Sequence, residues 1–322
     1  MRHFAIGFGL ATLLMAGVCA DGYLWLSAAG SPPGSVYRYN LRTGQVDRVI
    51  TPGAWGFVQS GDYNLLAYDG SALYIGLEND RTLLKVNPYT GALLSAFGYN
   101  MCNCFYGHHF MKDGAFYEGE LWRAAPARAA NSAGILYVSD ANGVPTMAYY
   151  APNQLFLQPI GLEWVGDVLM ITTLQGLYRV RFPDQPMEFE GEAYTLSGVP
   201  SGHMLGGLAY DAPRDALYLG TSDGNSAMLW RLTLDHGAQS ATATLVDILT
   251  LKGYPSGRHP TALGFVPARP GDADDNGCVD DADLLTVLFA FGGSNAQADL
   301  DADGIVDDAD LLIVLFNFGS GC

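Results

Sequence analysis

Short apolar runs separated by polar turns make up most of this chain. Between Asp21 and Pro267 the runs are rich in β-branched and aromatic residues, and each ends at Gly, Asp, Asn or Pro. Helical periodicity is almost absent from this region. The pattern predicts a mainly β domain over residues 21–267.

One strand unit recurs along the domain. Its middle strand is seen in "YLWLSA", "ALYIGL", "AFYEGEL", "VLMITT" and "ALYLGT", which start at Tyr23, Ala72, Ala115, Val168 and Ala216. Its next strand is seen in "VYRYNL", "LLKVNP", "ILYVSD", "LYRVRF" and "LWRLTL", which start at Val36, Leu83, Ile135, Leu177 and Leu229. A further strand precedes four of the units, starting at Leu65, His109, Gly161 and Gly207. Such self-similarity is typical of a repeat architecture.

The first unit lacks this preceding strand, and a matching run, "ALGFV" from Ala262, stands alone at the end of the domain. A last strand that completes the first sheet is how a β-propeller ring closes. We therefore expect a β-propeller, with five blades favoured. Six blades stay open because residues 100–159 are irregular, and a two-sheet sandwich explains the spacing less well.

The pattern changes after residues 268–270, which we interpret as a linker. Two apolar runs, "LLTVLFAFG" from Leu284 and "LLIVLFNFG" from Leu311, each follow an acidic segment and predict helices. Residues 271–322 contain twelve aspartates and no Glu, Lys or Arg, in a chain whose formal net charge is −17. The negative charge is therefore local to this segment. The absence of a basic stripe argues against a nucleic-acid partner.

The acidic segments repeat one spacing of oxygen-bearing residues, at positions 1, 3, 5, 9 and 12 of a loop. With the backbone carbonyl at position 7, the first loop offers Asp272, Asp274, Asn276, Cys278, Asp280 and Asp283. The second loop offers Asp299, Asp301, Asp303, Ile305, Asp307 and Asp310. Calcium prefers six or seven oxygen ligands, and glycine at position 6, here Gly277 and Gly304, allows the sharp turn. We expect two calcium ions, with the apolar position 8 residues Val279 and Val306 joining the loops as a small strand pair.

An EF-hand has a helix on both sides of its loop and usually Glu at position 12, whereas here only the exiting helix follows and position 12 is Asp. With these departures residues 271–322 resemble the type I dockerin, in the variant that ends in Gly-Cys. The resemblance implies a small α-helical domain with two F-hand calcium loops. It also implies a cohesin-like protein or surface scaffold as partner.

The resemblance places partner contacts at loop positions 10 and 11, which are Asp281 and Ala282 in the first loop and Asp308 and Ala309 in the second. Cellulosomal dockerins often carry hydroxyl groups there, so these residues argue against a partner of the cellulosome type. The exposed face of each helix is a second candidate. It would contain Leu288, Phe289, Leu315 and Phe316, unless these residues pack the two helices together.

Residues 1–20 have a basic start, an apolar stretch and small residues before Asp21, and they predict a secretory signal peptide. A membrane anchor is the alternative, but the stretch is shorter than the roughly 20 residues that a spanning helix needs. Cys19 raises a lipoprotein signal, which Val18 disfavours. We expect a secreted or extracellular protein associated with the cell surface, with no transmembrane segment in the mature chain.

Export permits disulfides. Cys278 and Cys322 lie in the same small domain and form a plausible pair. Cys102 and Cys104 are too close for an easy bridge, so a strained disulfide, free thiols and metal ligation stay open.

Several polar residues precede the expected innermost strands, where loops would surround one mouth of a propeller channel: His108, His109, Gln158, His203, Arg258 and His259. They could hold a metal or an anionic sugar, although polar loop residues that simply line a wet channel are the favoured interpretation. Glu163 and Asp62 could add carboxylates there.

The stretch "CNCFYGHH" from Cys102 lacks the usual zinc spacing, and a disulfide-stiffened loop is favoured over a metal clip.

No phosphate loop, HExxH or CxxC pair is present in the sequence. The favoured hypothesis is an exported propeller that binds or displays a ligand, a carbohydrate among the candidates, and is anchored through a calcium-dependent dockerin–cohesin type interaction. The alternative is a carbohydrate-active enzyme, a glycoside hydrolase or polysaccharide lyase of polysaccharide catabolism. Such an enzyme needs an acid–base pair of carboxylates, and Glu163 has no obvious partner in the sequence.

Overall fold

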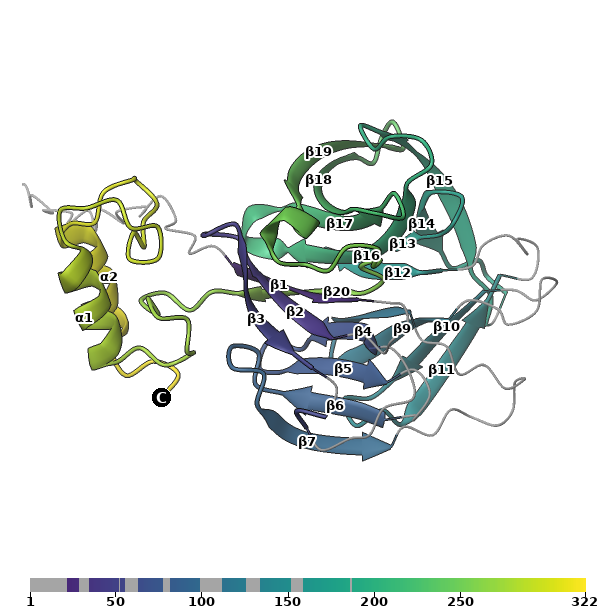
Figure 1. The fold of residues 1–322 in the computed structure, drawn as a ribbon. Helices are drawn as coiled ribbons and strands as arrows, with labels where there is room; N and C mark the ends of the chain where they lie inside the picture. The colour runs from purple at the N-terminus through teal and green to yellow at the C-terminus, as the bar shows by residue number, and fades with distance from the viewer. Residues whose placement is uncertain are drawn as a thin grey trace, which may run out of the picture.

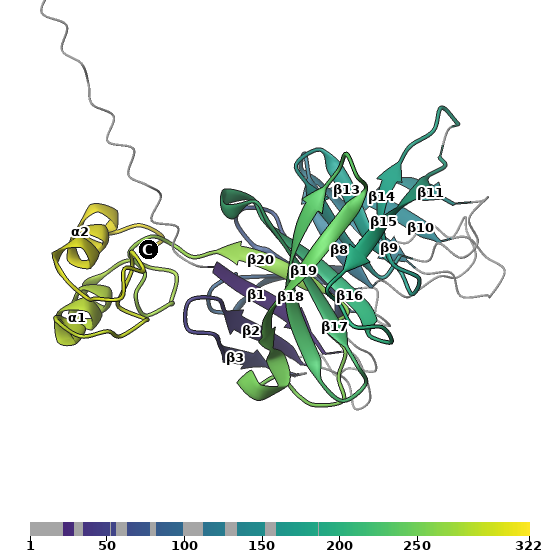
Figure 2. The ribbon, with the colours of Figure 1, turned by 90° about the horizontal axis from the view of Figure 1, so that it is seen from above.

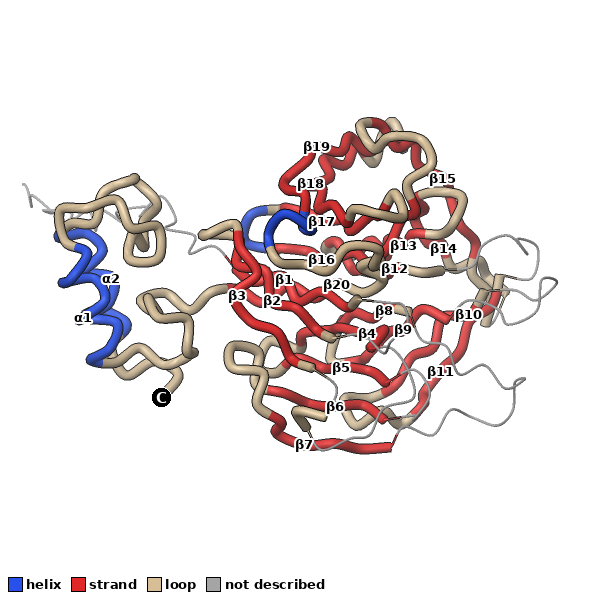
Figure 3. Tube along the Cα trace, in the orientation of Figure 1, coloured by secondary structure: helices blue, strands red, loops and turns tan. Residues whose placement is uncertain are grey.

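The computed structural model describes residues 22–28, 35–51, 53–55, 63–77, 82–98, 112–125, 134–151, 159–185 and 187–322. Strands fill this part of the chain up to Pro267, and two short helices follow (Figures 1 and 3). The expected signal peptide and Cys102, Cys104 and Asp62 lie outside the described residues.

The described strands form five antiparallel units of four strands each. The first contains β1 (Gly22–Ser27), β2 (Val36–Asn40), β3 (Gln45–Ile50) and β20 (Leu263–Pro267). The second contains β4 (Tyr63–Tyr68), β5 (Leu73–Leu77), β6 (Thr82–Val86) and β7 (Leu93–Gly98). The third contains β8 (Asp113–Tyr117), β9 (Glu120–Ala125), β10 (Ile135–Ser139) and β11 (Pro145–Tyr150).

The fourth unit contains β12 (Gly161–Val165), β13 (Val168–Thr172), β14 (Leu177–Arg181) and β15 (Glu190–Ser197). The fifth contains β16 (Met204–Asp211), β17 (Ala216–Ser222), β18 (Ala227–Asp235) and β19 (Ser240–Ile248). The outer strands β15 and β19 pair in parallel and join these two units into one eight-stranded sheet. Two short 3-10 helices, Ala212–Arg214 and Leu249–Lys252, lie in the fifth unit and just after it.

The innermost strand of each unit lies at the centre of the domain. In the described chain β4 contacts β8, β8 contacts β12, β12 contacts β16, β16 contacts β20, and β20 returns to β4. This closed ring gives the domain a propeller-like architecture. Strand β20 pairs with β1 from Leu263 opposite Leu26 to Pro267 opposite Gly22. The expected completion of the first sheet by the last strand is confirmed.

Adjacent units are held together by apolar side chains that pack face to face. One core cluster joins Leu65 and Tyr74 of the second unit to Leu121 and Tyr137 of the third. Four similar clusters fill the other junctions between neighbouring units. Removing this apolar surface from water on both faces of each unit is the main force that stabilises the ring.

Glycine lets the inner strands approach one another. A Cβ atom on Gly161 of β12 would lie 2.3 Å from the carbonyl oxygen of Gly206, and one on Gly207 would lie 2.5 Å from the backbone nitrogen of Leu263. Real Cβ atoms do not approach so closely. Backbone therefore fills the axis at this level of the ring.

The third unit corrects one strand assignment. We expected the run from Ala115 to be a middle strand, with an inner strand starting at His109. The run is instead a hairpin, in which β8 is the inner strand and β9 the middle one. Glu118 and Gly119 form its turn with φ values of 51° and 82°, a backbone conformation that a continuous strand does not adopt.

Helices α1 (Asp281–Ala290) and α2 (Asp308–Asn317) lie side by side at one end of the strand domain (Figures 1 and 2). Neither has the length and hydrophobicity of a membrane span, and the described chain contains no other α-helix. Their own small core contains Val279, Val287, Val306 and Val314. We call residues 271–322 the acidic module.

The expected strand pair between Val279 and Val306 is wrong. The backbone of Val279 exchanges hydrogen bonds with Gly319 and Ser320, which follow α2. The backbone of Val306 does the same with Gly292 and Gly293, which follow α1. Each loop is therefore tied to the end of the other repeat's helix, and this exchange connects the two halves of the acidic module.

Candidate functional site

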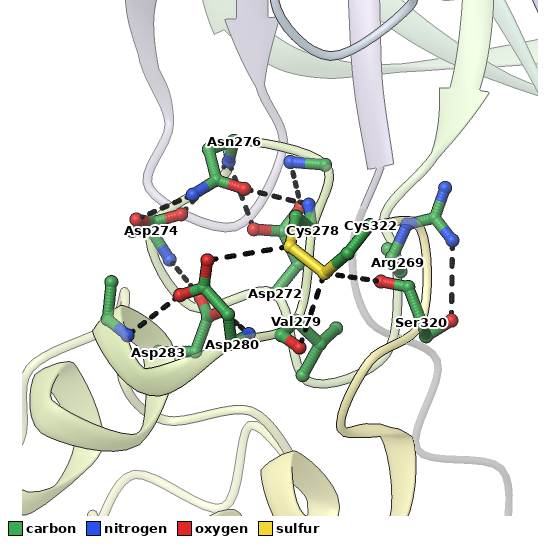
Figure 4. Close-up of a disulfide and its surroundings, with 12 residues drawn as sticks. Arg269, Asp272, Asp274, Asn276, Cys278, Val279, Asp280, Asp283, Ser320 and Cys322 are labelled. Carbon is green, nitrogen blue, oxygen red and sulfur yellow. Dashed lines mark hydrogen bonds between the residues drawn. A yellow bond between two sulfur atoms is a disulfide. The ribbon is translucent and has the colours of Figure 1, made fainter.

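The first acidic loop, residues 272–283, folds around its own carboxylates (Figure 4). The two oxygens of Asp272 accept hydrogen bonds from the backbone N–H groups of Asn276 (3.0 Å) and Gly277 (2.7 Å). Asp274 also accepts from Asn276, at 3.1 Å. Gly277 has a φ of 89°, which a residue with a side chain rarely adopts. The sharp turn predicted at position 6 is present.

The second loop, residues 299–310, repeats this geometry. Asp299 accepts from the backbone N–H groups of Asp303 (3.1 Å) and Gly304 (2.9 Å), and Gly304 has a φ of 95°. Asp301 accepts from Asp303 at 3.2 Å. The match extends beyond spacing to the individual hydrogen bonds, so the two loops are structural repeats.

The last aspartate of each loop connects the start of the loop to the start of its helix. Asp283 accepts from the backbone N–H groups of Ala273 (2.7 Å) and Asp274 (3.0 Å), and its other oxygen accepts from that of Asp280 (2.8 Å). Asp280 in turn accepts from Ala282 and caps α1, so the two aspartates form a capping box. Asp307 and Asp310 form the equivalent box at α2. The short side chain of aspartate at position 12 suits these hydrogen bonds to nearby backbone N–H groups.

Three carboxylates converge in each loop. The ligand atoms of Asp272, Asp274 and Asp283 lie within 4.8 Å of one another, as do those of Asp299, Asp301 and Asp303. Among the described residues, only these two groups bring together three side chains of the types that ligate metals. Carboxylate oxygens suit a hard divalent cation such as calcium.

The electrostatics of the loops also fit a cation. Burial, together with the charges of Asp275 and Asp283, raises the pKa of Asp272 to about 7. Burial and neighbouring carboxylates also raise the pKa values of Asp274 and Asp301. A divalent cation between these groups would offset both the lost hydration and the repulsion.

Only the first loop is joined to the strand domain by a buried carboxylate. Asp275, at position 4, accepts hydrogen bonds from the Tyr23 hydroxyl, from Asn40 Nδ2 (2.8 Å) and from Arg42 Nη2 (2.9 Å). The Asp275 and Arg42 side chains are only 6% and 7% exposed. This contact was not predicted from the sequence. The signal available was the difference between Asp275 and Ala302, which stands at position 4 of the second loop.

Two further features hold the first loop in place. The guanidinium of Arg269 lies over the ring of Tyr89, 5.1 Å from its centroid, and Gly277 packs so closely on that ring that a Cβ would lie 2.8 Å from it. Cys278 and Cys322 form the proposed disulfide, beside Arg269 and Ser320 (Figure 4). The first loop is therefore fixed both to the strand domain and to the end of the chain.

Apolar side chains on both helices face solvent. Phe289 and Phe316 expose 86% and 76% of their surface, and Leu288 and Leu315 expose 45% and 49%. Val287 and Val314 fill the core between the helices instead. Asp281, Ala282 and Asp308 are exposed, and Ala309 is partly exposed. The candidate partner residues are therefore available at the surface.

The residues proposed for the channel mouth are described only in part, since His108, His109 and Gln158 lie outside the described residues. The imidazole of His203 lies 3.4 Å from the Thr221 hydroxyl and edge-on to Trp230. His259 precedes β20, and burial lowers its pKa to about 4, so it is neutral at pH 7. Arg258 beside it is partly exposed. No described carboxylate or cysteine joins His203 and His259 in a three-residue metal cluster.

Glu163 does not belong to that mouth. It lines a pocket of about 390 Å³ at the opposite end of the ring, with Tyr68, Tyr117 and Pro267, where β4, β8 and β20 end. The polar residues considered from the sequence instead precede the starts of inner strands. We call this cavity the central pocket.

No protein-family model matches the chain, and no curated protein matches it. Similar solved structures include the glutaminyl cyclase of Myxococcus xanthus, at 12% identity over 68% of this chain and 86% of that one, with a TM-score of 0.42. They also include the Malassezia sympodialis allergen Mala s 1, at 13% identity over 77% and 83% of the two chains, with a TM-score of 0.43. The periplasmic gluconolactonase of Pseudomonas aeruginosa aligns at 15% identity over 69% and 67%, with a TM-score of 0.39.

Proposed function

We propose that this protein is an exported propeller-like binding protein, held at a scaffold or cell surface by calcium-dependent docking of its acidic module. The observation that carries the proposal is the pair of acidic loops, which repeat the same hydrogen bonds to Asp272 and Asp299. Each loop leads through a capping box into a helix with exposed apolar residues. Calcium would order the loops and thereby position the helices.

The type of partner follows from the helix surfaces. Phe289 and Phe316 occupy equivalent positions in the two repeats and are the most exposed large apolar side chains of the described chain. Exposed aromatic residues on a rigid element are typical anchors of protein interfaces. Together with the resemblance to dockerins, they support a cohesin-like module as the partner. The disulfide between Cys278 and Cys322 supports an oxidising, extracytoplasmic location.

Surface plasmon resonance against a panel of purified cohesin modules tests the proposal. We expect binding in calcium that is abolished by EGTA. Replacing Phe289 and Phe316 together by Ala should weaken it at least about a hundredfold, since interface anchors each contribute about 2 kcal/mol or more. Leu251→Ala, at an equally exposed site of the strand domain, is the matched control and should bind normally. Calcium-independent binding, or equal loss in the control, would contradict the proposal.

We propose binding rather than polysaccharide cleavage as the role of the strand domain. Glu163 is the only carboxylate among the described residues that line the central pocket. Asp113 lies nearby in β8 but is fully buried, and one of its oxygens accepts from the backbone N–H groups of Leu162 (3.3 Å) and Leu208 (3.1 Å). Glycoside hydrolysis usually needs two carboxyl groups that both reach the substrate.

A further inference from the structure

The central pocket is formed jointly by the whole ring. Each of the five inner strands, or the turn that follows it, contributes lining residues, so the cavity lies on the axis of the domain. Its volume of about 390 Å³ is that of a site for a small molecule. A cavity built from five separate chain segments needs the complete ring, which makes it a product of the fold rather than of one loop.

Aromatic side chains dominate the described lining. Six of them contribute, from all five inner strands: Tyr68, Phe116, Tyr117, Trp164, Tyr210 and Phe265. The rings of Tyr117 and Trp164 stack, with centroids 4.0 Å apart and an interplanar angle of 14°. Aromatic faces carry partial negative charge and attract cations. The walls of the pocket therefore favour an apolar or a positively charged ligand.

One acidic side chain stands among these rings. Glu163 Oε2 accepts a hydrogen bond from the backbone N–H of Tyr210 (3.2 Å), and Oε1 accepts from that of Trp164 (2.8 Å). The side chain is only partly buried and lines the cavity, so its oxygens can also meet a ligand. The described lining contains no Lys, Arg or His. The carboxyl group therefore has no cationic side chain beside it in the pocket.

We propose that the central pocket binds a small organic ammonium ion. The cationic nitrogen would pair with Glu163, and its alkyl groups would pack on the faces of the surrounding aromatic rings. A carboxylate within an aromatic wall is the combination that recognises ammonium groups, because charge attraction and the cation–π interaction act together. This ligand is additional to the protein partner of the acidic module.

The charges of the groups around the pocket favour this ligand class. Burial raises its pKa to about 8, and no neighbouring cation lowers it. The other titratable groups that line the pocket are the phenols of Tyr68, Tyr117 and Tyr210, and the Asp113 carboxyl lies behind the wall. All of these groups are neutral or acidic, so the pocket favours a cation over an anion. An ammonium ion would displace the proton of Glu163.

Isothermal titration calorimetry on the full chain, with choline and with dimethylbutanol as probes, tests the proposal. Dimethylbutanol is the neutral analogue of choline, with carbon in place of nitrogen. The titrations are made in a buffer about one pH unit above the pKa of Glu163, so that the carboxylate is ionised. We expect choline to bind at least about tenfold more tightly than dimethylbutanol, which corresponds to about 1.4 kcal/mol. Glu163→Gln should remove this preference, so that the variant binds the two probes about equally.

Glu190→Gln is the matched control, because it removes the same charge from an exposed position on the outer strand β15. It should keep the preference for choline. Equal binding of the two probes by the unaltered protein, or a preference that survives Glu163→Gln, would overturn the proposal. Binding of glucose but not of choline would also overturn it, because a neutral sugar would then be the ligand class. None of these results depends on calcium or on the cohesin-binding test.

Discussion

At the residue scale, the position of an acidic side chain in the fold decides its chemistry. The repeated turn of the acidic loops could be predicted because it depends on local spacing, and Asp272 and Asp299 accept equivalent hydrogen bonds in the two repeats. The environment of Glu163 could not be predicted, since five distant segments form it. The same holds for Asp275, whose partners Tyr23, Asn40 and Arg42 lie more than two hundred residues away.

The raised pKa of Glu163 predicts a pH-dependent stability. A carboxyl group whose folded pKa exceeds its unfolded value of about 4.5 favours the folded state at low pH, and that contribution is lost as the pH rises toward about 8. Burial also raises the pKa of Asp113, and this shift changes the stability in the same direction. Each unit by which folded and unfolded pKa values differ is worth about 1.4 kcal/mol.

Urea unfolding between these two pH values should therefore show a free energy of unfolding that falls with pH. Glu163→Gln should make this fall shallower, because glutamine does not titrate. The part of the fall that is due to Asp113 should remain. Glu190→Gln, at its exposed position, should leave the slope unchanged. A slope that Glu163→Gln does not alter would show that the carboxyl group titrates normally in the folded protein.

At the scale of elements, a small sequence difference makes the two loops inequivalent. Asp275 and Ala302 occupy the same position and have similar φ values of 60° and 57°. Only Asp275 forms buried hydrogen bonds with the strand domain, whereas Ala302 is exposed. The helices and loops could be predicted from their repeat, but this docking could not, because it depends on the turn between β2 and β3.

Replacing Asp275 by Ala should loosen the acidic module from the strand domain. Arg42 would be left as an unpaired buried cation, which costs about 3 to 5 kcal/mol. In calcium, calorimetry of the variant should show the acidic module unfolding at a lower temperature than the strand domain. Asp281→Ala removes the same charge from an exposed site and should leave the profile unchanged. An unaltered profile for Asp275→Ala would contradict the role of this contact.

At the scale of the whole molecule, a ring of strands has the central pocket at its axis and the acidic module at one end (Figure 1). The strand units and the completion of the first sheet by the last strand could be predicted from the sequence, because strands with regular spacing give a repeated sequence pattern. The third unit was misassigned, since a tight hairpin at Glu118 and Gly119 interrupts the period. A cavity that five units form together gives no repeated pattern in the sequence.

The central claim is that the acidic module binds calcium in both loops, and calcium titration calorimetry on the full chain tests it most directly. We predict two calcium ions per chain, with Asp272→Asn and Asp299→Asn each removing one, because each is the first ligand of its loop. Asp308→Asn, an exposed control with the same charge change, should still bind two. Absence of calcium binding, or a stoichiometry that neither ligand variant changes, would contradict the account.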